Sequence, residues 1–214
     1  MKIRLVFLAC LLVFCLSSLQ AFAHPHAWID YRTHVVLDDD NRITAIKEHW
    51  VFDEYYTEFA LHDFDPHKTG KLGHDELMLL ANDNLKNLKA YDYFTSFEKD
   101  GKKVAIKSIS DTNSYLVSGH IALDFTVWLA EPADAVKQKV SYRIYDPSYY
   151  ISMLHDKKDA IILEGKHAAS CQHELITPQP DITKTNFAAA IDKNGQAPEE
   201  LGSFFAQRMI ILCK

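Results

Sequence analysis

The chain has 214 residues, of which 48% are hydrophobic, and its formal net charge is −6 with histidine counted as neutral. This hydrophobic content excludes an intrinsically disordered chain, and the length suits one domain. An acidic surface repels nucleic acid and anionic lipid, so neither is expected as a partner.

Residues 1–23 predict a secretory signal peptide. Two basic residues precede an apolar run, and Ala21 and Ala23 occupy the small-residue positions before a cleavage site. The remaining residues, 24–214, are expected to form a single exported domain. No later run is long and apolar enough to span a bilayer, so we expect no stable membrane insertion after cleavage.

Cleavage after Ala23 would make His24 the new amino terminus. Its imidazole and its free α-amine could then both bind a metal at neutral pH. His26 points to the same face of an extended segment, because residues i and i+2 share a face. Pro25 has no N–H, so the planar copper chelate that uses two backbone amides cannot form. The alternative is a solvated, frayed terminus.

The two segments that follow predict a β-hairpin with Asp39 and Asp40 as its two-residue turn. This pairing places Ile29 opposite Trp50 on an apolar face. A slip of one residue would destroy the sorting of apolar and polar side chains between the two faces.

On the other face, the same pairing places Asp30 opposite His49 and His26 opposite Asp53. Imidazole and carboxylate ligands suit zinc, and imidazole also suits nickel, cobalt and copper. The predicted metal site therefore combines His24, His26 and His49 with a carboxylate from Asp30 or Asp53. The alternative is that His49 and Asp30 form only a cross-strand hydrogen bond.

A helical insert is predicted over about residues 54–90. Segments 54–62 and 75–91 each predict a helix, since apolar residues recur at helical spacing in the second. The segment between them has the spacing of an EF-hand loop. The matching residues, at loop positions 1, 6, 7, 8 and 12, are Asp65, Gly70, Lys71, Leu72 and Glu76.

The ligand chemistry of this loop is poor. His67, Thr69 and Gly73 stand at loop positions 3, 5 and 9, where oxygen ligands are needed. We therefore expect calcium binding to be weak or absent. The remaining alternatives are a borderline metal bound by His67 and His74, or a vestigial loop whose helices still pack.

Several strands are predicted beyond the insert. Segment 91–109 predicts a hairpin with Asp100-Gly101 at its turn. Segment 114–129 predicts one long strand, or two with a bulge at Gly119. Segment 177–197 is polar and contains prolines, so a loop is predicted there. The expected fold class is α+β, a mainly antiparallel β domain with an EF-hand-like helix-loop-helix insert.

Two cysteines, Cys171 and Cys213, remain after signal cleavage. Export to an oxidising compartment predicts a disulfide between them. The alternatives are two buried thiols, or Cys171 and His173 acting as a ligand pair.

No catalytic motif accompanies these residues. The sequence lacks G-x-S-x-G, a phosphate-binding loop and C-x-x-C, and nothing pairs a nucleophile with a base, so no enzyme is predicted. Five further histidines have no partner at ligand spacing along the chain and are predicted to be surface or structural: His34, His62, His120, His155 and His167.

The chain resembles the DUF1007 family. The resemblance rests on HPHAWID after the signal, HWVFDE at 49–54, FDPHKTGKLGHDEL, YDYF at 91–94, IYDPSYY at 144–150 and LGSFFAQRMIILC near the end. It implies the periplasmic component of an uncharacterised transport system, found beside membrane permeases for nickel, cobalt or zinc. His67 and Thr69 depart from the acidic residues expected in the loop.

These observations predict a periplasmic protein that binds a divalent transition metal, with zinc as the first candidate. It would be an accessory or carrier for an inner-membrane metal permease. One rival is a calcium-responsive EF-hand-like module, and another is a copper-brace protein that uses His24.

Overall fold

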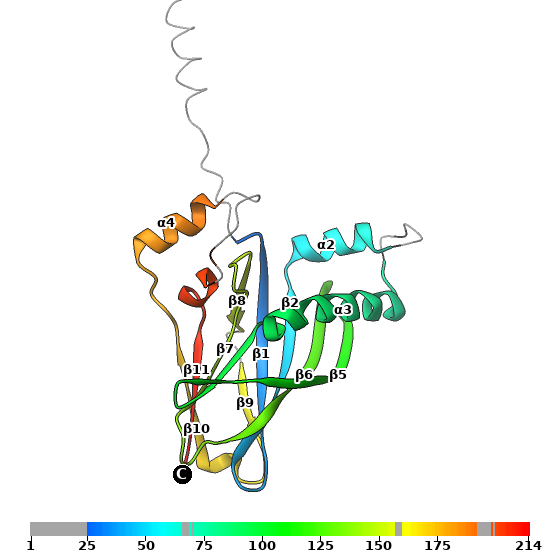
Figure 1. The fold of residues 1–214 in the computed structure, drawn as a ribbon. Coiled ribbons are helices and arrows are strands. Elements are labelled where there is room, and N and C mark those ends of the chain that lie inside the picture. Colours follow the sequence, from blue (N-terminus) through cyan, green and yellow to red (C-terminus); the bar gives the residue numbers. More distant parts are fainter. Residues whose placement is uncertain (1–24, 66–68, 70, 157–159, 192–197, 199) are drawn as a thin grey trace, which may run out of the picture.

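The computed structural model describes residues 25–65, 69, 71–156, 160–191, 198 and 200–214. The expected signal peptide and His24 lie outside the described residues, as do His67 and Gly70 of the loop. The described residues form two β-sheets and three α-helices (Figure 1). No helix within the described ranges is both long enough and apolar enough to cross a membrane.

The larger sheet has six strands in the order β5-β6-β2-β1-β8, with β9 also pairing with β1. Its strands are β1 (Ala27–Leu37), β2 (Arg42–Phe52), β5 (Ile106–Val117), β6 (His120–Asp134), β8 (Ile151–His155) and β9 (Ile161–Glu164). Strand β1 pairs antiparallel with β2 but parallel with β8 and β9. The expected α+β class with mostly antiparallel strands is confirmed.

The smaller sheet has five antiparallel strands in the order β10-β11-β7-β3-β4. Its strands are β3 (Thr95–Lys99), β4 (Lys102–Val104), β7 (Val140–Ile144), β10 (Cys171–Ile176) and β11 (Arg208–Cys213). Cys171 lies directly opposite Cys213 on the neighbouring strand, and the two form the predicted disulfide.

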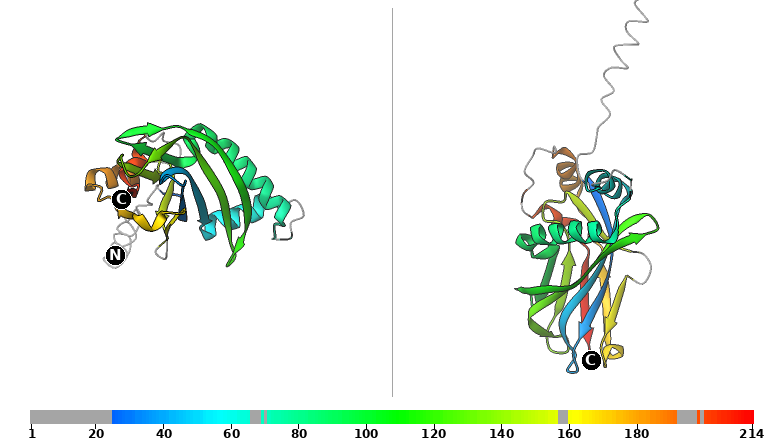
Figure 2. Two further views of the ribbon diagram at one scale, coloured as in Figure 1. Left: turned by 90° about the horizontal axis from the view of Figure 1, so that it is seen from below. Right: turned by 90° about the vertical axis from the view of Figure 1, so that its right-hand side faces the viewer.

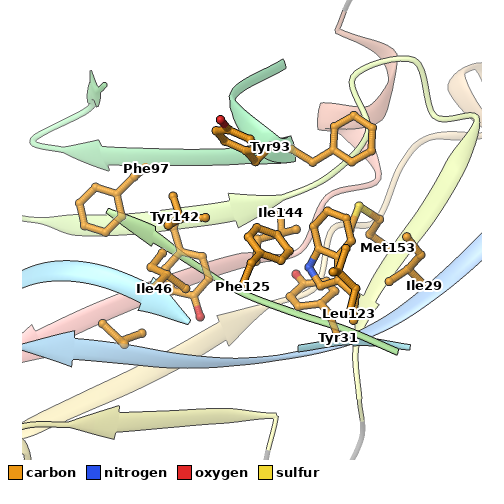
Figure 3. Packing of buried hydrophobic residues seen from close by; sticks show 14 of the residues in the cluster. Ile29, Tyr31, Ile46, Tyr93, Phe97, Leu123, Phe125, Tyr142, Ile144 and Met153 are labelled. Carbon is orange, nitrogen blue, oxygen red and sulfur yellow. The ribbon is translucent and has the colours of Figure 1, made fainter. Parts of the chain in front are cut away.

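The hydrophobic core lies between the two sheets. Every second residue of β1 is buried, as the period of a strand requires, and β2 follows the same rule except at the adjacent buried pair Ala45 and Ile46. Tyr31, Phe125, Phe97, Tyr142 and Ile144 come from both sheets and meet in this layer (Figure 3). Burial of this apolar surface is the main source of stability, at about 25 cal/mol per Å².

The helices are α2 (Glu54–Asp63), α3 (His74–Leu88) and α4 (Ile182–Ala190), with short 3-10 turns at η1 (Lys89–Phe94), η2 (Ala168–Ser170) and η3 (Leu201–Phe204). Helix α3 turns Leu77, Leu80, Ala81 and Leu85 into the main core and packs on β5. Helices α2 and α4 lie at one end of the molecule, opposite the carboxyl terminus (Figures 1 and 2). Both helices predicted in the insert are present, and the second ends at Leu88, three residues earlier than predicted.

The predicted β1–β2 register was wrong by two residues. Ile29 pairs with Phe52 and not with Trp50. The turn holds three residues, 39–41, and Asn41 adopts a positive φ of 59°, a typical geometry for three-residue hairpin loops. A bulge follows between Val36 and Leu37. From Ile46 onward the shift is even, so these side chains keep the face that was predicted for them. At the bulge the prediction was wrong, because Ile43 and Ala45 are buried and Thr44, predicted on the apolar face, is only half-buried.

Two further predictions were wrong. At Gly119 there is no bulge: Ser118 and Gly119, with φ of 50° and 87°, form a hairpin turn between β5 and β6. The segment 177–197 contains helix α4 in place of a continuous loop. Asp181 begins this helix by accepting a hydrogen bond from the Lys184 N–H (2.9 Å), a capping role that suits aspartate.

Candidate functional site

His26 lies directly before β1 and is anchored there by Tyr150. Its backbone N–H donates to the carbonyl of Tyr150 (2.8 Å), and its imidazole packs against the Tyr150 ring with 4.6 Å between ring centroids. Strand β1 begins at the next residue. The segment is therefore held at the edge of the sheet, which argues against a frayed terminus from this residue onward.

Asp53 lies at the same end of the sheet and joins three elements. Its Oδ1 accepts the Tyr56 N–H (2.9 Å) and so caps helix α2, while its Oδ2 accepts the Trp28 N–H on β1 (2.6 Å). A carboxylate oxygen has more than one lone pair, so the group could still bind a metal. Its first role in this structure is to connect β1 with the end of β2 and the start of α2.

The structure does not bring His49 to His26. His49 pairs with Arg32, which lies six residues beyond His26 along β1. At the rise of a strand this separation is about 20 Å. Asp30 pairs with Val51 and is exposed, so the predicted Asp30–His49 pair is wrong. The four predicted ligands that the structure describes are thus divided, with His26 and Asp53 at the end of the sheet and Asp30 and His49 on its outer face.

His49 has a carboxylate partner that the sequence did not reveal. Its Nδ1 lies 2.6 Å from Oδ1 of Asp124, which faces it from β6. The Tyr115 hydroxyl lies 3.4 Å from the same nitrogen. Asp124 is 75 residues away along the chain, so no local spacing could have indicated this pair.

A groove of about 450 Å³ opens on the outer face of the larger sheet around this pair. Arg32, His34, Lys47, His49, Asp111, Tyr115 and Asp124 line it. Its two cationic side chains form ion pairs, Arg32 with Asp156 (2.6 Å) and Lys47 with Glu164 (2.6 Å). The other carboxylate oxygen of Glu164 contacts Nδ1 of His34. Hydrogen bonds from Lys47 and His34 lower the pKa of Glu164.

Asp111 enters this groove through an irregularity of β5. It lies within the bulge between Ser110 and Asn113 and has a positive φ of 54°. Hydrogen bonds from Ser110 and Thr126 lower the pKa of its carboxyl group. Bulges of this kind redirect side chains and are frequent next to functional sites.

The predicted calcium loop is described only in part. The Thr69 hydroxyl donates to Oδ2 of Asp65 (3.1 Å), and the Lys71 N–H donates to the Thr69 hydroxyl (3.2 Å). Helix α3 begins at His74, loop position 10, as in an EF-hand. Glu76 folds back over Gly73, where a Cβ atom would lie 2.7 Å from its Oε2. Calcium binding by Asp65, Thr69, Lys71 and Glu76 stays a prediction.

Two observations bear on the metal ligands predicted from the sequence. The disulfide excludes the alternative in which the Cys171 thiolate binds a metal with His173. Within the described ranges, no three His, Cys, Asp or Glu side chains lie close enough together to hold a metal ion. His24 falls outside these ranges, so this statement does not extend to the predicted amino-terminal chelate.

A family model described as "Protein of unknown function (DUF1007)" matches residues 9–213. The chain belongs to the DUF1007 family. An uncharacterized protein of Haemophilus influenzae is 29% identical to it over 201 residues, which cover 92% of this chain and 94% of that relative. No solved structure matches this DUF1007 chain.

A second relative is shorter. An uncharacterized 15.5 kDa protein in the trpE 3' region of Spirochaeta aurantia is 28% identical over 102 residues. This match covers 48% of the present DUF1007 chain and 72% of the relative.

Proposed function

We propose that this DUF1007 protein binds a divalent transition metal in the periplasm, with zinc as the first candidate, and exchanges it with an inner-membrane permease. One observation carries the proposal. His26 is fixed to Tyr150 directly before β1 and is the third residue after the expected cleavage site, with the Asp53 carboxylate at the same end of the sheet.

The ligand set of this proposal is smaller than the one predicted from the sequence. It comprises the amine and imidazole of His24, the imidazole of His26 and the carboxylate of Asp53. Histidine and carboxylate ligands suit zinc, and nickel, cobalt and copper are the alternatives. His49 and Asp30 are left out, because the β1–β2 register places His49 far along the sheet.

Location at a chain terminus fits a carrier better than a structural metal site does. A carrier must release its metal to another protein, which requires ligands that are accessible and exchangeable. A closed four-ligand structural site binds too permanently for this purpose. The periplasmic location and the permease partner are part of the same proposal.

A calcium-responsive module is the second candidate. It is favoured by helix α3, which begins at the loop position where the exiting helix of an EF-hand begins. A copper brace that uses His24 is a third reading of the same terminus. Titration of one protein with Zn²⁺, Cu²⁺ and Ca²⁺ distinguishes the three functions by the order of affinities.

The decisive test compares two amino termini. Protein beginning at His24 and protein with one extra alanine before it are titrated with Zn²⁺ by calorimetry. We expect micromolar or tighter binding by the first and at least tenfold weaker binding by the second, since the extension removes the chelating amine. His26→Ala should weaken binding as well, while His62→Ala, at an exposed position of α2, should not. Equal affinities of the two termini contradict the chelate.

A cellular measurement tests the permease step. Cells that lack the protein are complemented with the wild type, with His26→Ala or with His62→Ala, and their zinc content is measured in the presence and absence of added zinc. Wild type and His62→Ala should restore the normal content, whereas His26→Ala should not. If all three proteins restored the zinc content, transport would not depend on the amino-terminal ligands.

A further inference from the structure

Two histidines, His34 and His49, share the groove on the outer face of the larger sheet. His34 comes from β1 and His49 from β2. His49 pairs with Arg32, two residues before His34, so the two histidines occupy diagonal positions on one face. Diagonal neighbours in an antiparallel pair lie about 7–8 Å apart, which is within reach of a shared ligand for long side chains.

Each imidazole is held by a carboxylate in the same way. Nδ1 of His49 is bonded to Asp124 (2.6 Å), and Nδ1 of His34 is bonded to Glu164. An imidazole that donates its Nδ1–H in this way presents the lone pair of Nε2. Histidines that bind metals almost always have such a carboxylate or carbonyl behind the ring. Both histidines line the same groove, and in each the Nδ1 atom is bonded to a carboxylate, which leaves Nε2 available to a ligand.

The charge of the groove also suits a cation. Arg32 lies opposite His49 and Lys47 lies opposite His34, but each cation is bound to a carboxylate, Arg32 to Asp156 and Lys47 to Glu164. Four carboxylates surround the groove, and they outnumber these two cations. They are Asp111, Asp124, Asp156 and Glu164. With neutral histidines the local charge is therefore negative.

We propose that this groove binds a divalent transition metal through Nε2 of His34 and Nε2 of His49, with water completing the coordination. Two imidazole donors select zinc, cobalt, nickel or copper over calcium and magnesium. A site with only two protein ligands releases its metal readily. This proposal goes beyond the amino-terminal chelate, because none of its residues belongs to that segment and it stands if that chelate is absent.

The carboxylates have a positioning role in this proposal. Asp124 and Glu164 do not touch the metal but fix the rings of His49 and His34. Removal of such a partner typically weakens metal binding by 10–100-fold. Asp124→Asn should therefore weaken binding less than His49→Ala does, and it should leave the groove's fold in place, because the amide keeps the shape of the carboxylate.

The experiment uses the full mature chain with one extra alanine before His24 and with His26→Ala, so that the amino-terminal chelate is disabled. This background is titrated with Co²⁺ by visible absorption and with Zn²⁺ by calorimetry. We expect one saturable site. His34→Ala or His49→Ala should weaken it at least tenfold, and the double variant should abolish it. His62→Ala is the matched control, since it removes an exposed histidine that also has a neighbouring carboxylate, Asp63.

Thermal unfolding of each variant without metal distinguishes lost ligands from lost structure. The proposal requires that Zn²⁺ raises the melting temperature of the background protein and not that of the folded double variant. No saturable site in the background, or an unchanged site in the double variant, overturns it. The failure of the amino-terminal chelate is seen separately, as equal Zn²⁺ binding by the authentic and the extended terminus.

Discussion

The indole Nε1 of Trp50 donates a hydrogen bond to the carboxyl group of Glu48 (2.9 Å), two residues away on the buried face of β2. The Thr95 hydroxyl on β3 donates to the other oxygen (2.7 Å), so the group connects the two sheets. Glu48 is only 2% exposed, and this burial raises its pKa to about 8. The carboxyl group is therefore neutral in the folded protein at pH 7.

Glu48 is expected to make the protein less stable as the pH rises. The folded state holds a proton that the unfolded state releases near the ordinary glutamate pKa of 4.5. The contribution of this group to the free energy of unfolding is complete below pH 4.5. This contribution is lost as the pH rises through 8, by up to about 1.4 kcal/mol per pH unit. Glu48→Gln should remove this slope, which urea unfolding between pH 5 and pH 9 measures. An unchanged slope in the variant would assign the pH dependence to other groups.

His155 is expected to make the protein less stable as the pH falls. It is 7% exposed, its ring packs on Tyr31 (4.2 Å between centroids), and its backbone N–H donates to Gln207 Oε1 (2.8 Å). Burial lowers its pKa from 6.5 to about 4. Its contribution to stability is complete above pH 6.5 and is lost as the pH falls through 4, because the unfolded state then binds the extra proton.

His155→Phe should keep the packing on Tyr31 and remove this loss of stability at low pH. Between about pH 4.5 and 6.5 the slopes of Glu48 and His155 have opposite signs, so the wild-type curve should be nearly flat there. Each single variant should then show the pH dependence of the unfolding free energy that the other residue causes. Urea unfolding of the two variants side by side checks this, and parallel curves for both would contradict the assignment.

The buried face of the first hairpin could be predicted from the sequence, but its register could not. Alternating apolar residues such as Ile29 and Val35 define the face whatever the pairing. The pairing depends on the turn, and nothing in four consecutive polar residues showed that Asn41 would take a positive φ and lengthen the loop. The predicted faces of β2 hold from Ile46 onward because the register error there is an even number of residues, and they fail at the bulge beside Thr44.

The outer-face groove illustrates a second limit. His49 was recognised as a candidate ligand, but His34 was assigned to the surface because no partner lies near it along the chain. Asp124 and Glu164 reach these histidines across strands β6 and β9, at sequence separations of 75 and 130 residues. Such cross-strand pairs depend on sheet topology, which a single sequence does not determine.

The Cys171–Cys213 disulfide is expected to contribute on the order of 4 kcal/mol, since it closes a loop with a sequence separation of 42. It ties the edge strand β10 to β11 directly opposite. Reduction, or the Cys171→Ser/Cys213→Ser double variant, should lower the melting temperature on the order of 10 °C. Calorimetry measures this shift. Two alkylatable thiols in protein isolated from the periplasm would show that the bond does not form in the cell.

The last prediction concerns calcium. Only Asp65 and Glu76 supply carboxylates at the main ligand positions of the loop, and ligand charge sets calcium affinity, so binding should be roughly millimolar. The Thr69 hydroxyl instead donates a hydrogen bond to Asp65. Replacing His67 and Thr69 with aspartate should strengthen calcium binding markedly. Without calcium the new carboxylate beside Asp65 should lower the melting temperature, because like charges repel.

Calcium titration of the wild type and of His67→Asp/Thr69→Asp, followed by melting temperature and tryptophan fluorescence, tests both statements. Adding Glu76→Gln to the double variant is the control, since it removes the bidentate ligand and should abolish the gain. Zn²⁺ binding at the amino terminus should be the same in all of these proteins. Sub-micromolar calcium binding by the wild type would favour the calcium-responsive function over the metal carrier. If the double variant gains nothing, the loop lacks EF-hand geometry, and the match in spacing between Asp65 and Glu76 is accidental.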